Sequence, residues 1–421
     1  MLKSRLCIAF FAFAVGCAPA QKPLTDYVNP MLGTATLWDS VDLGFKPTKR
    51  TWGAEVFPGS SLPNAMVQVS PVTKFHSGAG YQYEDSVIYG FTHTNKGHWN
   101  LCHIPLLPVT GTPTPGDYCS PFSHERESAA PGYYQVFLDR YGVDAQLSST
   151  LRCAFHKYTY PAGAAASLLA DLQRSNEHVR AWDIRKEGDN VFAGWQQTGE
   201  KMYFYAVANR PVTGIEPVVE GDREVRIVRF GEGDGALELR IGFSFVSEKN
   251  ARENLEAEML GKSFAEVRSE ATATWNDLLG RIRVEGGTER EKGLFYSSLY
   301  RSFLWPALRS DVNGEFTDVD GKVINPGFRY YTGPSYWDDY RNKLILLGML
   351  APDVAADVIS SDTDKGEKRG GFMPTFFHGD HASAFVAGTY LRGNRGFDVN
   401  RAYNLCLLYT SPSPRDMRRS R

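Results

Sequence analysis

The hydrophobic period of this chain changes near Ser247, and that change constrains the fold more than any other feature of the sequence. Upstream, short runs such as Ala65–Val69, Tyr133–Leu138 and Tyr203–Val207 alternate with Gly, Pro, Asp and Ser turns. Many short strands without intervening helices are typical of an antiparallel β-sandwich. Downstream, apolar residues recur at helical spacing, as in SFAEVRSEATATWNDLLGRI. The sequence therefore predicts a multidomain α+β protein in which a sandwich precedes a helical region.

These patterns divide the chain into five parts. They are a signal peptide (1–20), a β-sandwich (26–246), a helical linker (247–288), the first part of an all-helical toroid (289–404) and a tail (405–421). Within the toroid, helices are predicted at 336–349, 353–361, 381–391 and 398–408. The tail is predicted to be disordered or foreign, because the last helix runs directly into Ser-Pro repeats and basic residues.

The N-terminus has the features of a secretion signal. Lys3 and Arg5 precede the apolar run Leu6–Val15, which is too short for a permanent membrane span. Two processing routes are open: cleavage after the A-x-A motif that ends at Ala20, or lipidation of Cys17 in a lipobox-like AVGC sequence. We expect a secreted bacterial protein that is either periplasmic or an outer-membrane lipoprotein, and whose only contact with membrane is a lipid at Cys17.

Composition and cysteine usage exclude some functions for this chain. The formal net charge of the 421 residues is −2, and the only basic run is at the extreme C-terminus, which argues against nucleic-acid binding. Cys102, Cys119 and Cys153 have no metal-ligand spacing and allow at most one disulfide in an oxidising compartment. No cysteine is predicted to be catalytic.

The segment GPSYWDDYRNKLILLGML (333–350) contains the most suggestive side chains. A helix is predicted to start at Ser335, so that Trp337, Asp338 and Arg341 lie in its first turns. An aromatic face covers the apolar face of a pyranose, while carboxylates and guanidinium groups bind its hydroxyls. The alternative is structural, since Ser335 to Asp338 also fits an S-x-x-D capping box.

Three further loops carry candidate residues. The 50–61 loop contains Glu55, and the 90–100 segment contains His93, His98 and Trp99. Three interpretations of these histidines are open. They form hydrogen bonds to a polar ligand, they bind a metal ion as a pair, or they are loop residues whose hydrogen bonds are all made within the protein. The 370–381 loop contributes a further set, namely His378, Asp380 and His381, in which Asp380 is alternatively the N-cap of the next helix.

Collinear motifs run through nearly all of Asp26 to Tyr403. They include YVNPMLGT (27–34), FPGSSLPNAMVQVSP (57–71), GYQYEDSVIYGFTHT (80–94), SYWDDYRNKLILL (335–347) and GDHASAFVAGTYLRGNRGFD (379–398). Together they resemble glycoside hydrolase family 92, the bacterial exo-acting α-mannosidases. The resemblance implies an (α/α)6 catalytic barrel after the sandwich, a site between the domains, and Ca²⁺-dependent inverting release of terminal mannose from glycans. In such chemistry two carboxyl groups are roughly 6.5–9.5 Å apart, with a water between them.

Residue by residue, the resemblance places Trp337, Asp338 and Arg341 at the sugar-binding helix start and His381 in a Gly-Asp-His signature. The Glu that the family carries before this signature is absent, which leaves Asp380 as the nearest replacement acid. TWGAEV (51–56) replaces a glycine- and histidine-rich segment of the family, so the sugar contacts are expected to differ. The base and most Ca²⁺ ligands are expected beyond Arg421, so the metal ligands are unknown and the chain is predicted to be inactive as truncated.

Two other functions fit the same residues. A non-catalytic carbohydrate-binding lipoprotein would bind mannosides without turnover. A phosphorylase, or a hydrolase of another α-glycoside, would depend on phosphate or release a different sugar.

Overall fold

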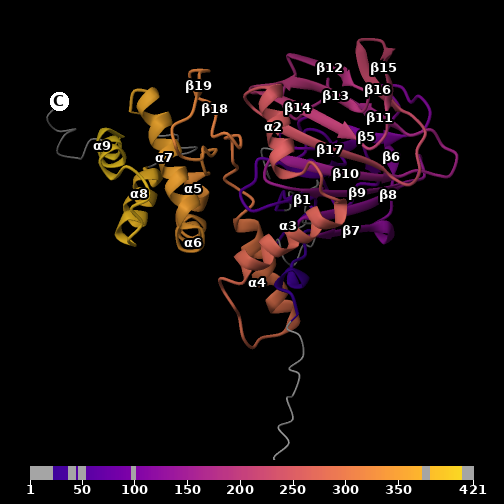
Figure 1. Ribbon diagram of the computed structural model, residues 1–421. Helices are drawn as coiled ribbons and strands as arrows, with labels where there is room; N and C mark the ends of the chain where they lie inside the picture. The colour runs from indigo at the N-terminus through magenta and orange to yellow at the C-terminus, as the bar shows by residue number, and fades with distance from the viewer. Residues whose placement is uncertain (1–21, 37–43, 46–53, 96–100, 372–379, 410–421) are drawn as a thin grey trace, which may run out of the picture.

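The protein is described here by a computed structural model, which covers residues 22–36, 44–45, 54–95, 101–371 and 380–409. An antiparallel β-sandwich is followed by helices that lie beside it, and in the chain between these regions α2 (Glu248–Glu258) lies against the sandwich while α3 (Phe264–Leu279) and α4 (Glu289–Ser302) lie below it (Figure 1). The predicted fold class, a sandwich followed by a helical linker and a helical region, is confirmed.

Two large sheets form the sandwich, and neighbouring strands in both are antiparallel. In spatial order, the seven-stranded sheet contains β1 (Ser60–Ser61), β2 (Gln68–Val72), β4 (Gly90–Thr92), β5 (Leu106–Val109), β11 (Ser167–Ala170), β16 (Arg223–Phe230) and β15 (Val212–Glu220). The eight-stranded sheet contains β12 (Ala181–Gly188), β13 (Val191–Gln197), β14 (Lys201–Ala208), β17 (Leu237–Ser244), β10 (Cys153–Thr159), β9 (Val143–Ser149), β8 (Tyr133–Leu138) and β7 (Glu127–Ala130). Short pairs are β3 (Val87–Ile88) with β6 (Ser120–Pro121), and β18 (Phe316–Thr317) with β19 (Val323–Ile324).

Alternation along the strands explains why these segments form a sandwich. In β14, Met202, Phe204 and Ala206 are buried while the residues between them are only half-buried, as expected for a strand with one face in a core. The predicted strand 133–138 matches β8 at both ends. The predicted strand at Ala65–Val69 is misplaced, because β2 begins only at Gln68.

The outer face of the eight-stranded sheet is covered by α2. A Cβ built on Gly242 of β17 would lie 2.1 Å from the carbonyl oxygen of Ala251, so only glycine permits this close approach. Leu255 and Met259 of α2 then pack with Phe155 and Phe264 in a small apolar cluster. The predicted linker is therefore a packed layer of the structure rather than a free connection.

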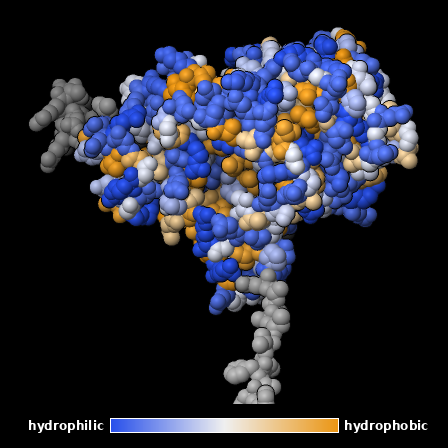
Figure 2. Space-filling model, viewed as in Figure 1, coloured by the Kyte–Doolittle hydropathy of each residue, from blue (hydrophilic) through white to orange (hydrophobic). Residues whose placement is uncertain are grey.

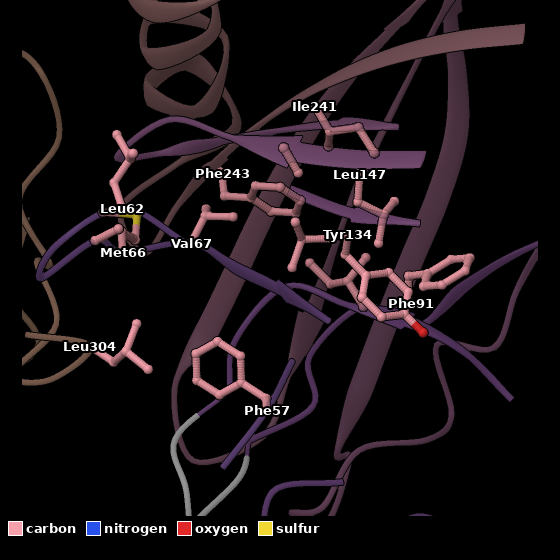
Figure 3. Packing of buried hydrophobic residues seen from close by; sticks show 14 of the residues in the cluster. Phe57, Leu62, Met66, Val67, Phe91, Tyr134, Leu147, Ile241, Phe243 and Leu304 are labelled. Carbon is pink, nitrogen blue, oxygen red and sulfur yellow. The ribbon is translucent and has the colours of Figure 1, made fainter. Parts of the chain in front are cut away.

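The main hydrophobic core continues from the sandwich into the helices. Trp275 of α3 is fully buried and donates its indole N–H to the Ser61 carbonyl at 2.7 Å. Leu304, which follows α4, lies near Phe57 and Met66 of the sandwich (Figure 3). Because one core spans both regions, their junction is held by burial of apolar surface.

The remaining helices are α5 (Tyr336–Asp339), α6 (Lys343–Leu350), α7 (Pro352–Lys368), α8 (His381–Leu391) and α9 (Val399–Tyr409). The single helix predicted at 336–349 is wrong, since the chain breaks at Asn342, whose side chain caps the N–H of Lys343. The predicted 381–391 helix is confirmed as α8. Helix α7 is longer than the predicted 353–361, because buried polar residues continue it: the hydroxyl of Thr363 donates to the carbonyl of Ile359.

The predicted start of a tail at residue 405 is also wrong. Helix α9 runs to Tyr409, and Leu405 is only 2% exposed. A Cβ on Gly366 would lie 2.5 Å from a methyl carbon of Leu405, so α9 packs closely on α7. Residues 410–421 lie outside the described residues.

Two other features of the described residues bear on the sequence predictions. Cys119, Cys153 and Cys406 are free thiols. No single helix among these residues has the length and apolarity of a membrane span, although α6 and α7, which are bent by 120° at Ala351, meet both criteria when taken together.

Candidate functional site

Two neighbouring cavities lie where the sandwich meets the helical region. The larger, of about 840 Å³, is lined from the sandwich by residues of β14 and the turn before it, and from the helical side by the β18–β19 hairpin, Tyr330–Gly333 and α7. The smaller, of about 340 Å³, includes Leu101, His103, Glu177 and Trp305 in its wall. Gly199, Glu200, Arg309 and Thr332 line both cavities. Hydrophobic side chains lie along the middle of the molecular face where the two regions meet (Figure 2).

The sandwich side of these cavities carries fixed polar groups. His103 is buried, and its two ring nitrogens lie 2.8 Å from the hydroxyls of Thr94 and Thr198. Burial lowers the pKa of His103 to about 4, an effect that Arg309 reinforces and Glu177 opposes. Burial raises the pKa of Glu177, but hydrogen bonds from Thr198 and the Gly199 N–H outweigh it, so this pKa is lowered. At neutral pH the wall therefore presents a neutral imidazole and a carboxylate.

The helical side contains a buried hydrogen-bond network that begins in α7. The ammonium group of Lys365 donates to the Tyr331 carbonyl at 2.7 Å and to Asp362 at 3.0 Å. The other carboxylate oxygen of Asp362 accepts from the hydroxyl of Tyr336 in α5 at 2.5 Å. This network fixes α5 to α7 and holds Lys365 at the edge of the larger cavity.

The α5 residues that the sequence singled out lie just beyond the cavities along the chain. Gly333 lines the larger cavity, and its carbonyl accepts the indole N–H of Trp305 at 3.2 Å. Trp337 is 43% exposed, and Asp338 and Arg341 are exposed as well. These three side chains are therefore accessible to a ligand, and their role in sugar binding stays a prediction.

The capping alternative at the start of α5 is not confirmed in its predicted form. Ser335 is the N-cap residue, but its side chain accepts no hydrogen bond from the helix backbone. Its hydroxyl instead donates to the Asp338 carboxylate at 2.5 Å. This contact orients the Asp338 side chain but does not cap the N-terminus of the helix. The carboxylate can therefore accept further hydrogen bonds from a ligand.

The loop before α8 contributes a second cluster around Tyr340. The ring of His381 stacks on that of Tyr340 with centroids 4.1 Å apart and planes 8° apart, and the Arg341 guanidinium lies 4.5 Å from the Tyr340 centroid. Arg341 and His381 therefore both contact the ring of Tyr340. Asp380 is the N-cap of α8, since its Oδ1 accepts the Ser383 N–H at 3.1 Å. The capping interpretation is confirmed, and a catalytic role for Asp380 stays a prediction.

The sandwich loops give a different result. His93 is fully buried, with Nδ1 2.9 Å from the Ile104 carbonyl and Nε2 3.0 Å from Nε2 of His156. Because both ring nitrogens are engaged inside the sandwich, the predicted contact of His93 with substrate is wrong in this structure, and the structurally satisfied alternative holds. Glu55 has a left-handed backbone (φ 48°) and lies against Gly78. The candidates His98, Trp99 and His378 lie outside the described residues.

The expected Ca²⁺ site finds no counterpart in the described part of the chain. There, no group of three or more His, Cys, Asp or Glu side chains is placed to hold a metal ion. A hard cation such as Ca²⁺ needs six to eight oxygen ligands. Because most ligands of this ion are expected beyond Arg421, Ca²⁺ binding stays a prediction from the family resemblance.

Sequence reasoning missed the groups in the cavity walls, namely His103, Glu177, Glu200 and Arg309. They come from separate loops and carry no motif spacing. The one local signal was Arg309 itself, a charged residue in the apolar stretch FLWPALR. Burial of that side chain is visible only in three dimensions.

Comparison with known proteins identifies the family. The Glycosyl hydrolase family 92 N-terminal domain matches residues 27–253, and the Glycosyl hydrolase family 92 catalytic domain matches residues 250–420. The chain belongs to glycoside hydrolase family 92. The catalytic-domain match extends through residue 420, beyond the predicted start of the tail.

Solved structures share the architecture. The family GH92 α-mannosidase BT3965 of Bacteroides thetaiotaomicron has a TM-score of 0.84 and 25% identity, over 93% of this chain and 57% of that one. Its complex with mannoimidazole gives a TM-score of 0.83 and 26% identity, over 92% of this chain and 55% of that one. An uncharacterized secreted glycosidase of the fungus Arthroderma benhamiae is 24% identical over 344 residues, which are 69% of this chain and 42% of that protein. The chain thus spans little more than half of the solved relatives.

Proposed function

We propose that this chain forms the sandwich and part of the catalytic domain of an exo-acting glycosidase that releases terminal α-mannose from glycans. The observation that carries the proposal is the placement of Trp337, Asp338 and Arg341. All three are exposed on or directly after α5, and they follow Gly333, which lines a cavity walled by both family 92 domains, by at most eight residues along the chain. Cavities walled from two sides suit the end of a glycan better than its middle, which favours exo-action.

The mannose specificity is supported by the solved relatives, which are α-mannosidases, one of them in complex with mannoimidazole. Asp338 is suited to accept hydrogen bonds from vicinal hydroxyls, and Arg341 to donate them. The Trp337 ring offers an apolar face to the sugar. A ring held in this way is oriented before bond cleavage, which lowers the barrier by positioning.

We also propose inverting hydrolysis, which the family resemblance supports. It requires an acid and a base on opposite faces of the sugar, roughly 6.5–9.5 Å apart. Asp380 is the acid candidate; with Oδ1 accepting the Ser383 N–H, the transferable proton would be on Oδ2. Calcium dependence and the base stay predictions from the resemblance, because the described side chains form no metal cluster.

Secretion belongs to the same proposal. The signal-like N-terminus and the secreted fungal relative support it. Whether the mature protein is a periplasmic enzyme or a lipoprotein anchored through Cys17 is decided by mass spectrometry of the N-terminus, since a lipid adds a diacylglyceryl group at that cysteine.

The test uses Asp338→Ala in a form of the protein that includes a complete family 92 catalytic domain. Mannose release from α-mannobiose should fall at least a hundredfold, because orienting contacts made in the transition state are lost. The matched control is Asp353→Ala, an exposed carboxylate in the first turn of α7 and outside both cavities. Like Asp338, Asp353 interacts favourably with the dipole of a helix, but Asp353 is not proposed to contact the sugar.

Four results would change the interpretation. A twofold or smaller effect of Asp338→Ala would return Asp338 to a purely structural role. Binding of mannosides without turnover would favour the carbohydrate-binding protein. Phosphate-dependent cleavage would indicate a phosphorylase, and release of another sugar would indicate a different α-glycosidase.

A further inference from the structure

A further cavity, of about 630 Å³, lies on the outer face of the eight-stranded sheet, between α3 and the strands β9 and β10. Gln146 and Lys157, which are paired across these two strands, line it from the sheet, and one face of α3 lines it from the other side. None of its lining residues lines the two cavities between the sandwich and the helical region. Its volume is within the roughly 300–1,000 Å³ of small-molecule pockets.

Small side chains of α3 keep this cavity open. Those that line it are Ala265, Ser269, Thr272 and Ala273, which recur at the three- and four-residue spacing of one helix face. The large apolar residues of α3, such as Trp275, are on a different face and are buried. The space between α3 and the sheet is therefore left unfilled by the sequence of the helix itself.

Two cations line the cavity and have no anionic partner. Within the described residues, neither Lys157 nor Arg268 forms an ion pair or a hydrogen bond through its side chain. The Arg268 guanidinium lies 3.6 Å from the ring centroid of Tyr133, and Nζ of Lys157 lies 5.7 Å from that of Phe264. Such contacts with aromatic rings orient the two cations but leave their charge available to a ligand.

The neighbouring carboxylates are engaged elsewhere. Glu266 accepts hydrogen bonds at the N-cap of α3, and Glu270 pairs with Lys262 at 2.6 Å. Asp144 accepts hydrogen bonds from two glutamine side chains of β8 and β9 at 2.7 and 2.9 Å. None of these three carboxylates lines the cavity. The lining is thus positively charged, which favours an anionic ligand.

The rest of the lining suits a sugar ring. Ser269 offers a hydroxyl, and the hydroxyl of Thr272, which donates to the Arg268 carbonyl at 3.0 Å, can still accept a hydrogen bond. Phe264 contributes an aromatic side chain and Ala273 a methyl group, against which the apolar face of a pyranose can pack. A bare inorganic anion would leave these groups unused.

We propose that this cavity is a non-catalytic binding site for an acidic sugar unit, a pyranose that carries a carboxylate or a phosphate, and that Lys157 and Arg268 bind its anionic group. The proposal goes beyond the proposed function, because the site is on another surface and requires no mannose. A glycosidase with such a site stays attached to glycans that contain acidic units, which raises the local concentration of the chain ends on which it acts.

The experiment measures dissociation constants by ligand-observed NMR titration of the chain as it stands. The probes are glucose, glucuronate and glucose 6-phosphate, which share one pyranose ring and differ at carbon 6. Each partly exposed ion pair should strengthen binding about threefold, so an acidic probe should bind about tenfold more tightly than glucose. Added NaCl should weaken this preference by screening. The tighter of the two acids identifies the anionic group that is recognised.

Variants assign the binding to the cavity. Lys157→Met and Arg268→Met should each weaken the acidic probe about threefold, and the double variant should bind it no better than glucose. Ala273→Phe, at an exposed position, should weaken all probes by filling the cavity without a change of charge. The matched control is Lys249→Met, since Lys249 pairs with Glu253 at 3.4 Å on the surface of α2 and lines none of these cavities. It should leave all affinities unchanged.

Melting temperatures of all variants show whether a loss of affinity is a loss of folded protein. Equal affinities for glucose and both acids, or no binding of any probe, would overturn the proposal. Undiminished binding of the acids by the double variant would also overturn it, by placing them elsewhere on the chain. Inorganic phosphate or acetate that binds as tightly as the corresponding acidic sugar would refute the sugar as ligand. Each of these results leaves the proposed release of mannose standing, because that function depends on α5 and is tested with Asp338→Ala.

Discussion

Arg152 joins three parts of the chain at one buried point. Its Nη1 donates to Glu258 of α2 at 2.6 Å, and its Nε donates to the Ser310 carbonyl in the helical region at 2.8 Å. Glu258 also accepts from the Thr150 hydroxyl at 2.6 Å and from the Arg152 N–H at 2.9 Å. The two charged side chains are 9% and 14% exposed. Removing the cation would leave a carboxylate buried between the sandwich and the helices.

Replacing Arg152 with Met keeps most of the apolar volume and removes only the charge and the donors. Breaking a buried ion pair by removing one partner costs about 3–5 kcal/mol of unfolding free energy. For a domain of the size of this sandwich, each kcal/mol lowers the melting temperature by roughly 2–4 °C. We therefore expect the melting temperature of Arg152→Met to fall by roughly 6–20 °C.

The assay is thermal unfolding followed by near-ultraviolet circular dichroism, together with urea unfolding at 25 °C. Arg252→Met is the control, because Arg252 forms an ion pair with Glu256 in which both side chains are about half exposed. Such exposed pairs are screened by water and contribute little to stability. The double variant Arg152→Met/Glu258→Gln should recover at least about 1 kcal/mol, since the stranded charge is removed. A loss below about 1 kcal/mol in the single variant, or no recovery in the double variant, would refute the reasoning.

Two further predictions concern stability. Burial lowers the folded-state pKa of His93 to about 3 and of His103 to about 4 from 6.5, so the unfolded chain binds more protons below pH 6.5 and stability is lost as the pH falls toward those values. Each histidine should lower the free energy of unfolding by about 2 kcal/mol between pH 7 and pH 5; urea unfolding that gives equal or higher stability at pH 5 would contradict this. Leu405→Ala should cost about 2–5 kcal/mol because Leu405 is buried under α7, whereas Leu407→Ala, at a 56% exposed position, should cost far less. Equal melting temperatures for the two leucine variants would show that α9 is not packed as described.

Local patterns in the sequence were sufficient for the main architecture. Strand β8 and helix α8 have the predicted bounds, because alternation and helical spacing are properties of consecutive residues. The N-cap at Asp380 was anticipated for the same reason, since a cap involves groups only three residues apart. The family, too, follows from motifs that are read along the chain.

Contacts between distant residues decided the rest. The polar C-terminal half of α7 has partners in other elements, such as Tyr336 of α5, whose hydroxyl donates to Asp362. His93 looked like a binding residue in its loop, yet its partner is His156, 63 residues away.

The residues that line the two cavities between the sandwich and the helical region also could not be predicted from local sequence patterns. Glu177 and Glu200 come from the sandwich, and Arg309 from the helical side. The sequence determined where strands and helices form because those preferences are local. Only the tertiary structure decided which charges are buried together, because burial and electrostatic pairing depend on distance in space and not on separation along the chain.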